Sequence, residues 1–428
     1  MKFTTMVQGF SKGITPAVDV SSKGDKKFEG TDRINLEVNR DEIVVSAFNK
    51  VVAITSKLSD LTTNDLSYRF DTEGKTSVNA KDLMSVLESF PPESSVIFEL
   101  KTGKDGKAQE LSVTMEKDAD QFQTLPCFGQ LITLPTKATQ FTKTAEIRKD
   151  ILSYGVGKVA FAAGFEKAES SKIYLNTSLK FNKDKVRFSN GTGARHAVLD
   201  LEGTGLVKGV TSEIAMLIPA AVLLDCTKLI ETSNSDMVKI EESKKSDIYP
   251  FQIIFSSDPH EIIVVGLDSS LQWVKEDNII KQVYDFKMVT KGDDWAYAAK
   301  GTSATFNEQI KKERRAHKAH VDVDMAKKTM TIKTNETMRS NRKVSIVDAN
   351  APKESNCSFI CMSAYLREIS NIVRGDDYIQ VEAIGAKKPV LIRFYAGDKV
   401  ADGDKIKLVN SAKNFTEQFV VFFGTHSA

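Results

Sequence analysis

The chain has 428 residues, 41% of them apolar and 27% charged, proportions that are ordinary for a soluble globular protein of two to four domains. Its formal net charge of +2 excludes the large basic excess of proteins that grip DNA tightly, while a weak contact needs only basic residues sorted onto one surface. Four scattered cysteines, no signal peptide and no apolar run of membrane-spanning length predict a soluble cytoplasmic protein without membrane association.

Residues 1–139 contain the first set of predicted elements. Gly9 and Gly13 weaken the prediction of a helix after the first strand, whereas Asn79 is a favourable N-cap for a later helix. In chain order the elements are a strand over residues 2–4, an irregular segment carrying Lys12, a hairpin of residues 36–38 and 43–45, a helix over 79–90 and a strand over 96–100.

Residues 140–282 repeat this order. The helix here begins with Pro219, which suits the first helical position because the missing N–H would have no helical partner there. In chain order the elements are a strand over residues 146–148, a glycine-containing segment leading to Lys158, a hairpin of residues 179–181 and 186–188, a helix over 219–230 and a strand over 237–240.

Residues 283–428 carry the same order a third time. In chain order the elements are a strand over residues 285–287, a segment leading to Lys300, a hairpin of residues 321–323 and 330–332, a helix over 362–373 and a strand over 378–381. An alternating strand is also expected near residues 419–424.

Two markers agree on the length of the repeat. The helices start at residues 79, 219 and 362, so the intervals are 140 and 143 residues; the hairpins start at residues 36, 179 and 321, so the intervals are 143 and 142. Matching apolar trios on each helix need a sheet to cover them: Leu83, Val86, Phe90; Leu223, Cys226, Ile230; Leu366, Ile369, Val373. The pattern predicts three tandem α+β domains at 1–139, 140–282 and 283–428, each with two helices packed on antiparallel sheets. The alternative is a long α+β protein whose hairpins are similar by chance.

Several short segments resemble the bacterial DNA polymerase III β sliding clamp family, in that family's order. They are residues 1–4, 123–126, 172–176, 186–198 and 388–392. The chain departs from the family in its tail, 419–424, in the loop 190–197, where an Asp is lost and Arg195 is shifted, and near 267–278, where the usual Pro-Asp-Tyr is missing. These departures indicate a divergent clamp, such as a phage-encoded one.

The resemblance implies a ring built as a head-to-tail homodimer, in which edge strands of the first and last domains pair and helices line the hole. Double-stranded DNA would then be held topologically through sequence-independent phosphate contacts, with a basic lining offset by an acidic outside. The candidate DNA contacts, each of which could instead be a solvated surface charge, are Lys12, Lys81, Lys158, Lys228, Lys300 and Arg367.

The resemblance also implies a pocket for short apolar peptides of the replicative polymerase, the clamp loader and other partners, formed by the middle and last domains. The candidates are Leu175, Thr192, Gly193, Arg195, His196, Pro389, Val420 and Phe422. For Val420 and Phe422 the alternative is a terminal strand packed in the core, and His196 could be a surface histidine. Such a processivity factor would act in the cytoplasm of a bacterium or a phage-infected cell, close to the nucleoid.

Motifs of enzymes are scarce in the sequence. A Walker A sequence is missing, and residues 191–193 lack the third glycine of a dinucleotide-binding fingerprint. His317 and His320 have no carboxylate or cysteine pattern beside them that would complete a metal site, and the basic run 311–315 fits a solvated surface better than a DNA-facing loop. We therefore expect a non-catalytic protein without cofactor or metal. The alternatives are a three-domain binding or structural protein outside replication, and a hydrolase without a recognisable motif.

Overall fold

The computed structural model describes the chain except for residues 25–28, 103–108, 164–171, 193, 245–250, 268–270, 272, 274–275, 304–317, 335–339, 351–355, 374–376, 385–389, 396–415 and 424–428. The first stretch contains β1 (Lys2–Met6), α1 (Val7–Ser22), β2 (Arg33–Val38), β3 (Ile43–Phe48), β4 (Val52–Leu58), β5 (Arg69–Thr72), β6 (Gly74–Asn79), α2 (Ala80–Glu88), β7 (Ser95–Thr102), β8 (Gln109–Met115) and β9 (Asp118–Phe128).

The second stretch has the same order, with two short 3₁₀ helices added. It contains β10 (Phe141–Arg148), α3 (Lys149–Val159), η1 (Ala160–Ala162), η2 (Lys172–Leu175), β11 (Asn176–Asn182), β12 (Lys185–Gly191), β13 (Arg195–Glu202), β14 (Val207–Lys208), β15 (Ile214–Pro219), α4 (Ala220–Glu231), β16 (Met237–Ser243), β17 (Ile253–Ser257) and β18 (His260–Val264).

A linker with the short helix α5 (Asp277–Ile280) leads into the third stretch. It contains β19 (Phe286–Lys291), α6 (Gly292–Ser303), β20 (Lys318–Asp324), β21 (Thr329–Thr334), β22 (Ser340–Ser345), β23 (Asp348–Asn350), β24 (Cys357–Met362), α8 (Ser363–Ile372), β25 (Tyr378–Ala383), β26 (Val390–Tyr395) and β27 (Thr416–Phe423).

The strand pairing recurs in the same form in all three stretches. In the first, two antiparallel sheets have the orders β4-β3-β2-β6 and β9-β8-β7-β1. The corresponding orders are β13-β12-β11-β15 and β18-β17-β16-β10, then β22-β21-β20-β24 and β27-β26-β25-β19. Each of these repeats therefore combines two four-stranded antiparallel sheets with two helices, as the sequence periodicity predicted.

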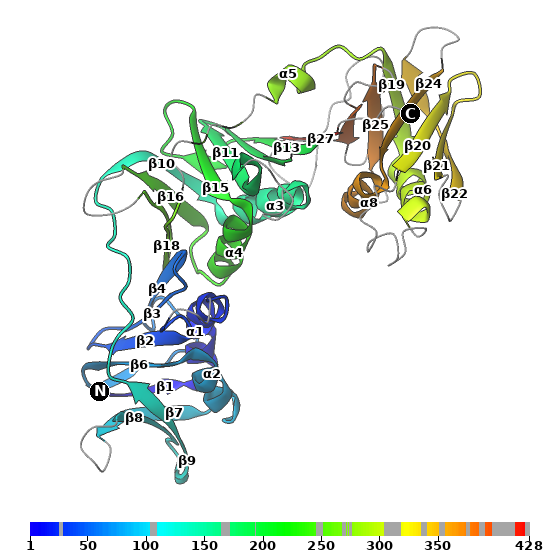
Figure 1. Cartoon of the computed structure of the whole chain (residues 1–428). Coiled ribbons are helices and arrows are strands. Elements are labelled where there is room, and N and C mark those ends of the chain that lie inside the picture. Colours follow the sequence, from blue (N-terminus) through cyan, green and yellow to red (C-terminus); the bar gives the residue numbers. More distant parts are fainter. Residues whose placement is uncertain are drawn as a thin grey trace. The chain divides into compact units, whose positions relative to one another are not determined.

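The chain divides into two compact units, and the division runs through the second repeat. In the unit that holds the first repeat, β4 pairs with β18, which joins the sheets of the first two repeats. In the unit that holds the third repeat, β13 pairs with β27 in the same way. Figure 1 shows α1 and α2 together on one side of the strands of the first repeat. The domain boundaries at 139/140 and 282/283 stay a prediction.

The second helix of each repeat has the buried face that its sequence pattern predicted, with small differences. The Asn79 side chain caps α2 by accepting hydrogen bonds from the backbone N–H groups of Lys81 (3.0 Å) and Asp82 (3.2 Å). Leu87 is fully buried on α2, whereas Val86 is half-buried.

The predicted position of Pro219 as the first helical residue was wrong. Pro219 is the last residue of β15 and is paired with Asn176, because a proline can end a strand as readily as it can begin a helix.

The first helix of each repeat is more regular than its glycines suggested. α1 is 16 residues long although it contains Gly9, Gly13 and Pro16. A Cβ at Gly9 would lie 2.1 Å from the backbone oxygen of Asp65, and one at Gly13 would lie 2.7 Å from a Leu58 methyl carbon. These glycines therefore allow the helix to pack closely on its neighbours, which outweighs their low helix propensity.

Candidate functional site

The six predicted DNA-contacting residues lie one on each of the six long helices that the structure describes. Five of their side chains are exposed, and Lys158 on α3 is half-buried, with its ammonium 5.2 Å from the ring centre of Phe419 on β27. The exposed residues are Lys12 on α1, Lys81 on α2, Lys228 on α4, Lys300 on α6 and Arg367 on α8. Whether these residues contact DNA stays a prediction.

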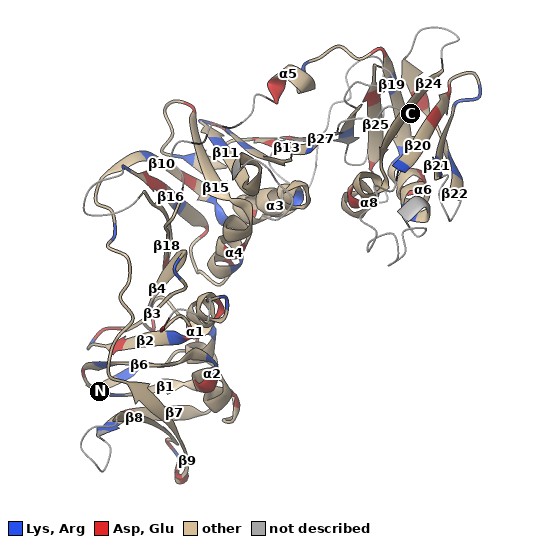
Figure 2. Ribbon diagram, viewed as in Figure 1, with Lys and Arg blue, Asp and Glu red and all other residues tan. Residues whose placement is uncertain are grey.

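The helices as a set are not basic, in contrast to the expected lining. Figure 2 shows acidic and basic segments on the same helices. Their basic residues are Lys12, Lys81, Lys149, Lys158, Lys228, Lys300 and Arg367; their acidic residues are Asp19, Asp82, Glu88, Asp150, Asp225, Glu231, Asp293, Asp294 and Glu368. A helix surface with these charges cannot hold a phosphate backbone by strong net attraction.

A second group of predicted residues meets where β13 pairs with β27. His196 stands opposite Phe422 in the ladder, and their rings are stacked at 4.9 Å between centres. Tyr174 at the end of η2 and Trp273 of the linker approach the His196 ring edge-on, at 6.0 and 6.3 Å. We refer to His196, Phe422, Tyr174 and Trp273 as the His196 patch.

The position of His196 depends on a glycine across the ladder. A Cβ at Gly191 would lie 2.3 Å from Nδ1 of His196, so only glycine leaves room for the ring. Burial lowers the pKa of His196 to about 4, so the imidazole is neutral near pH 7. His196 is therefore a half-buried aromatic residue with a polar edge, and not a freely solvated histidine.

Arg195, the next predicted residue, faces away from this patch. It is 7% exposed, forms an ion pair with Glu368 on α8 and lies 5.3 Å from the ring centre of Tyr365. Burial raises the pKa of Glu368, while the Arg195 guanidinium opposes that rise. Thr192 shapes the turn before β13, since its hydroxyl accepts from the backbone N–H groups of Ala194 and Arg195, both at 3.2 Å.

The remaining predicted pocket residues differ in their environments. Val420 is 5% exposed in a core cluster with Val198, Tyr284 and Leu391, as the alternative of a buried terminal strand predicted. Phe422 belongs to the same cluster at 3% exposure and also stacks on His196. Leu175 is half-buried at the end of η2, and Gly193 and Pro389 lie outside the described residues.

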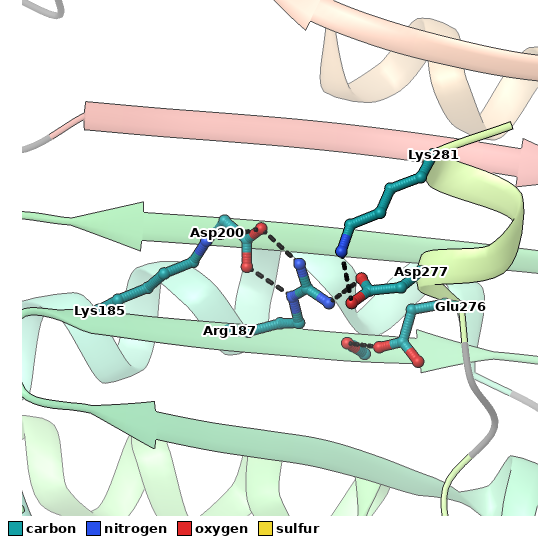
Figure 3. Close-up of polar contacts among 7 residues, drawn as sticks. Lys185, Arg187, Asp200, Glu276, Asp277 and Lys281 are labelled. Atoms are coloured by element: carbon teal, nitrogen blue, oxygen red, sulfur yellow. Dashed lines mark hydrogen bonds and ion pairs between the residues drawn. The ribbon is translucent and has the colours of Figure 1, made fainter. Parts of the chain in front are cut away.

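A network of charges fixes the linker beside these strands (Figure 3). Arg187 on β12 donates two hydrogen bonds to Asp200 (2.6 and 2.8 Å) and a third to Asp277 on α5 (2.6 Å). Hydrogen bonding to Asp200 raises the pKa of Arg187, and hydrogen bonding to Arg187 lowers the pKa of Asp277. Ser189 donates to the buried Glu276 at 2.7 Å. The linker that carries Trp273 is therefore anchored to β12 just before α5.

Sequence reasoning did not name Tyr174, Trp273, Tyr365 and Glu368 as site residues, because each meets its partner only through long-range packing. Tyr174 lies in the segment 172–176 that carried the resemblance, but only Leu175 of that segment was predicted for the pocket. Among the described residues, no three His, Cys, Asp or Glu side chains gather in a way that could hold a metal ion. His317 and the run 311–315 lie outside the described residues. No helix in the described part of the chain combines the length and apolar character needed to cross a bilayer.

Comparison with known proteins finds matches in structure but none in sequence. No family model and no curated protein matches the chain. The DNA polymerase III subunit beta of Pseudomonas aeruginosa, however, matches over 100% of both chains with a TM-score of 0.77 at 13% identity. The DNA polymerase sliding clamp of Bacillus subtilis matches over 100% of this chain and 99% of its own, with a TM-score of 0.76 at 15% identity.

This chain has the fold of the bacterial DNA polymerase III β sliding clamps. The beta subunit of the Streptococcus pyogenes DNA polymerase agrees, with a TM-score of 0.75 at 12% identity over 100% of both chains. The match confirms the α+β clamp fold and the resemblance found in the sequence. At such low identity it shows the clamp fold and leaves each residue's role to be argued from this chain.

Proposed function

We propose that the protein is a DNA sliding clamp, a non-catalytic processivity factor that encircles duplex DNA without reading its sequence. The observation that supports this most is the full-length clamp fold together with a pairing scheme that recurs three times in one chain. Three domains at 1–139, 140–282 and 283–428 in each of two chains would supply six repeats for a head-to-tail ring. The function then needs neither catalytic residues nor a cofactor.

The charge of the helices fits a topological hold. One or two exposed or half-buried cations on each helix, among acidic neighbours, give a surface that binds phosphates weakly and can slide along them. A strongly basic surface would bind the phosphate groups more tightly and would slow the movement of the protein along the duplex. We therefore propose that the six predicted cations contact phosphates transiently. The closed ring would keep the protein on the DNA.

We propose the His196 patch as the docking site for short apolar peptides of the replicative polymerase and the clamp loader. Aromatic rings on three sides and a polar imidazole edge suit such a peptide, because apolar walls supply burial and a few polar atoms supply orientation. Trp273→Ala and Tyr174→Ala should each weaken binding of the polymerase at least about tenfold, measured by surface plasmon resonance, and leave solution mass unchanged. Unaltered binding in both variants would reject this site.

The mass and shape of the particle test the ring. Light scattering should give about twice the chain mass of 47.3 kDa, and electron microscopy should show a closed ring with a hole that admits duplex DNA. The alternatives, a binding protein outside replication or a hydrolase without a known motif, predict no such hole. In this proposal the protein acts on DNA in the cytoplasm of a bacterium or of a phage-infected cell.

A further inference from the structure

Trp273 forms one wall of the His196 patch, but its side chain has no hydrogen bond with any described residue. The indole Nε1 is buried without a partner, and the ring meets that of His196 edge-on at 6.3 Å between centres. Such ring contacts alone are a weak restraint. The position of Trp273 therefore depends on how the linker that carries it is held.

Glu276, three residues after Trp273, ties the linker to the sheet. It is 2% exposed, and one of its carboxylate oxygens accepts a hydrogen bond from the Ser189 hydroxyl on β12 at 2.7 Å (Figure 3). A hydrogen bond to a buried carboxylate is among the stronger kinds, because the group has lost its hydration. Among the described residues after Trp273, Glu276 is the first with a side chain bonded to a strand.

The helix α5, which follows Glu276, has further anchors of its own. Arg187 bonds to the first residue of α5 at 2.6 Å, and Tyr284 and Arg393 donate to its backbone carbonyls at 3.1 and 2.9 Å. Loss of the Glu276 bond would therefore leave α5 attached and would loosen chiefly the part of the linker that carries Trp273.

The first linker is tied down at the same place in its own sheet. Asn35 and Ser178 are equivalent, because they oppose Ser46 and Ser189 in strand ladders of the same order. The Asn35 side chain exchanges two hydrogen bonds with the backbone of Ile132, at 2.9 and 3.0 Å. Two linkers of different sequence are thus anchored at one sheet position, which indicates that the anchor is needed wherever a linker crosses the strands.

The aromatic patch is present beside the second linker and not beside the first. Two residues further along the same ladders, Gly191 opposes His196 in one sheet and Phe48 opposes Ala53 in the other. Ala53 belongs to an apolar cluster on which Phe48 and Leu134 of the first linker pack. The first linker therefore covers a closed apolar surface, whereas the second one forms a wall of the half-buried imidazole.

We propose that Glu276 is a positioning residue of the peptide site: its hydrogen bond with Ser189 holds the linker so that Trp273 stays at the edge of His196. This inference rests on the proposed docking of partner peptides at the His196 patch. A wall that is already fixed raises affinity, because the peptide does not have to order it on binding. Glu276 is buried, so it acts through Trp273 and not by touching the peptide.

Two substitutions break this anchor, and two matched ones keep it. Ser189→Ala removes the donor and Glu276→Met the acceptor, and each should weaken binding of the polymerase about five- to tenfold in surface plasmon resonance. Glu276→Gln should bind within about twofold of wild type, because its amide oxygen can still accept from Ser189. Ser178→Ala should also bind like wild type, since Ser178 opposes Ser189, is as deeply buried and has a hydroxyl without a partner among the described residues.

The fluorescence of Trp273 distinguishes positioning from a general loss of stability. The chain contains two tryptophans, and Trp295→Phe removes the other one without losing a hydrogen bond to any described residue. In this background, Ser189→Ala and Glu276→Met should shift the emission of Trp273 to longer wavelength and increase its quenching by acrylamide. Ser178→Ala and Glu276→Gln should leave both properties as they are.

The results separate the anchor from the site. If Trp273→Ala weakens polymerase binding but Ser189→Ala and Glu276→Met bind like wild type, with or without a shift in emission, the positioning role of Glu276 is wrong and the docking site stands. Unaltered binding in Trp273→Ala itself would contradict the docking site, and the positioning role would fall with it.

Discussion

Single glycines decide how closely the helices approach the sheets. In α3, a Cβ at Gly155 would lie 2.3 Å from Cε2 of Phe188, whereas a Cβ at Gly157 would meet nothing within 4 Å. Both residues lower the helix propensity equally, and the sequence gives no sign of which one packs against the sheet. Only the tertiary contact with Phe188 distinguishes Gly155 from Gly157.

The two glycines therefore predict opposite effects on stability. Gly155→Ala should lower the free energy of unfolding by about 1–3 kcal/mol through overpacking, and Gly157→Ala should raise it by about 0.5–1 kcal/mol through helix propensity. Urea unfolding of the two variants beside wild type measures both. Equal effects of the same sign would show that α3 does not pack on β12 as described.

His260 makes the joint of β4 with β18 sensitive to acid. It is 4% exposed, and its two ring nitrogens lie 2.9 Å from the hydroxyl oxygens of Ser56 and Thr232. Burial, reinforced by Lys149, lowers its pKa from 6.5 to about 4. The unfolded chain therefore binds a proton before the folded chain does, and stability that is present above pH 6.5 is lost as the pH falls towards 4.

Replacing this histidine should remove part of that acid sensitivity. Between about pH 7 and pH 5, wild type should lose about 2 kcal/mol through His260, beyond the loss that the similarly shifted His196 causes in both proteins. His260→Gln should be less stable than wild type at neutral pH but should show a shallower decline. Denaturant unfolding at several pH values measures the slope, and an identical slope in the variant would refute the assignment.

At the scale of elements, the strand–helix–strand order and the hairpins could be predicted because they depend on residues close in sequence. The same local logic failed for α1, where packing outweighs Gly9 and Gly13, and for Pro219, which ends a strand. The His196 patch could be predicted only in part. Trp273 lies 77 residues after His196, and no local sequence pattern predicts that the linker brings the two rings together.

The linker depends on Arg187 for its attachment. Arg187→Met would remove both hydrogen bonds to Asp200, whose side chain is only 11% exposed and would keep only the ion pair with Lys185 at 3.3 Å, and it would remove the hydrogen bond to Asp277, at a cost of about 2–3 kcal/mol. Hydrogen exchange over residues 277–280 should become faster, while exchange in the first repeat stays unchanged. Lys281→Met is the control, since Lys281 meets Asp277 at 3.6 Å with a side chain that is 77% exposed. Unchanged protection in Arg187→Met would mean that apolar contacts alone hold α5.

For the whole molecule, the nearly balanced charge of the helices separates binding strength from residence on DNA. Replacing all six helix cations, Lys12, Lys81, Lys158, Lys228, Lys300 and Arg367, by alanine should reduce the salt slope of affinity for linear DNA by up to about 5 for each chain of the assembly. The lifetime on closed circular DNA should change far less, because the proposed ring would hold the duplex topologically. An unchanged salt slope, measured by fluorescence anisotropy, would place the phosphate contacts elsewhere on the protein.

The proposed function of the threefold repeat requires that duplex DNA passes through a closed ring. The most direct measurement follows the labelled protein on one plasmid before and after the circle is cut at a single site. The account predicts long retention on the closed circle and rapid loss from the free ends after cutting. Equal lifetimes on circular and linear DNA would contradict it.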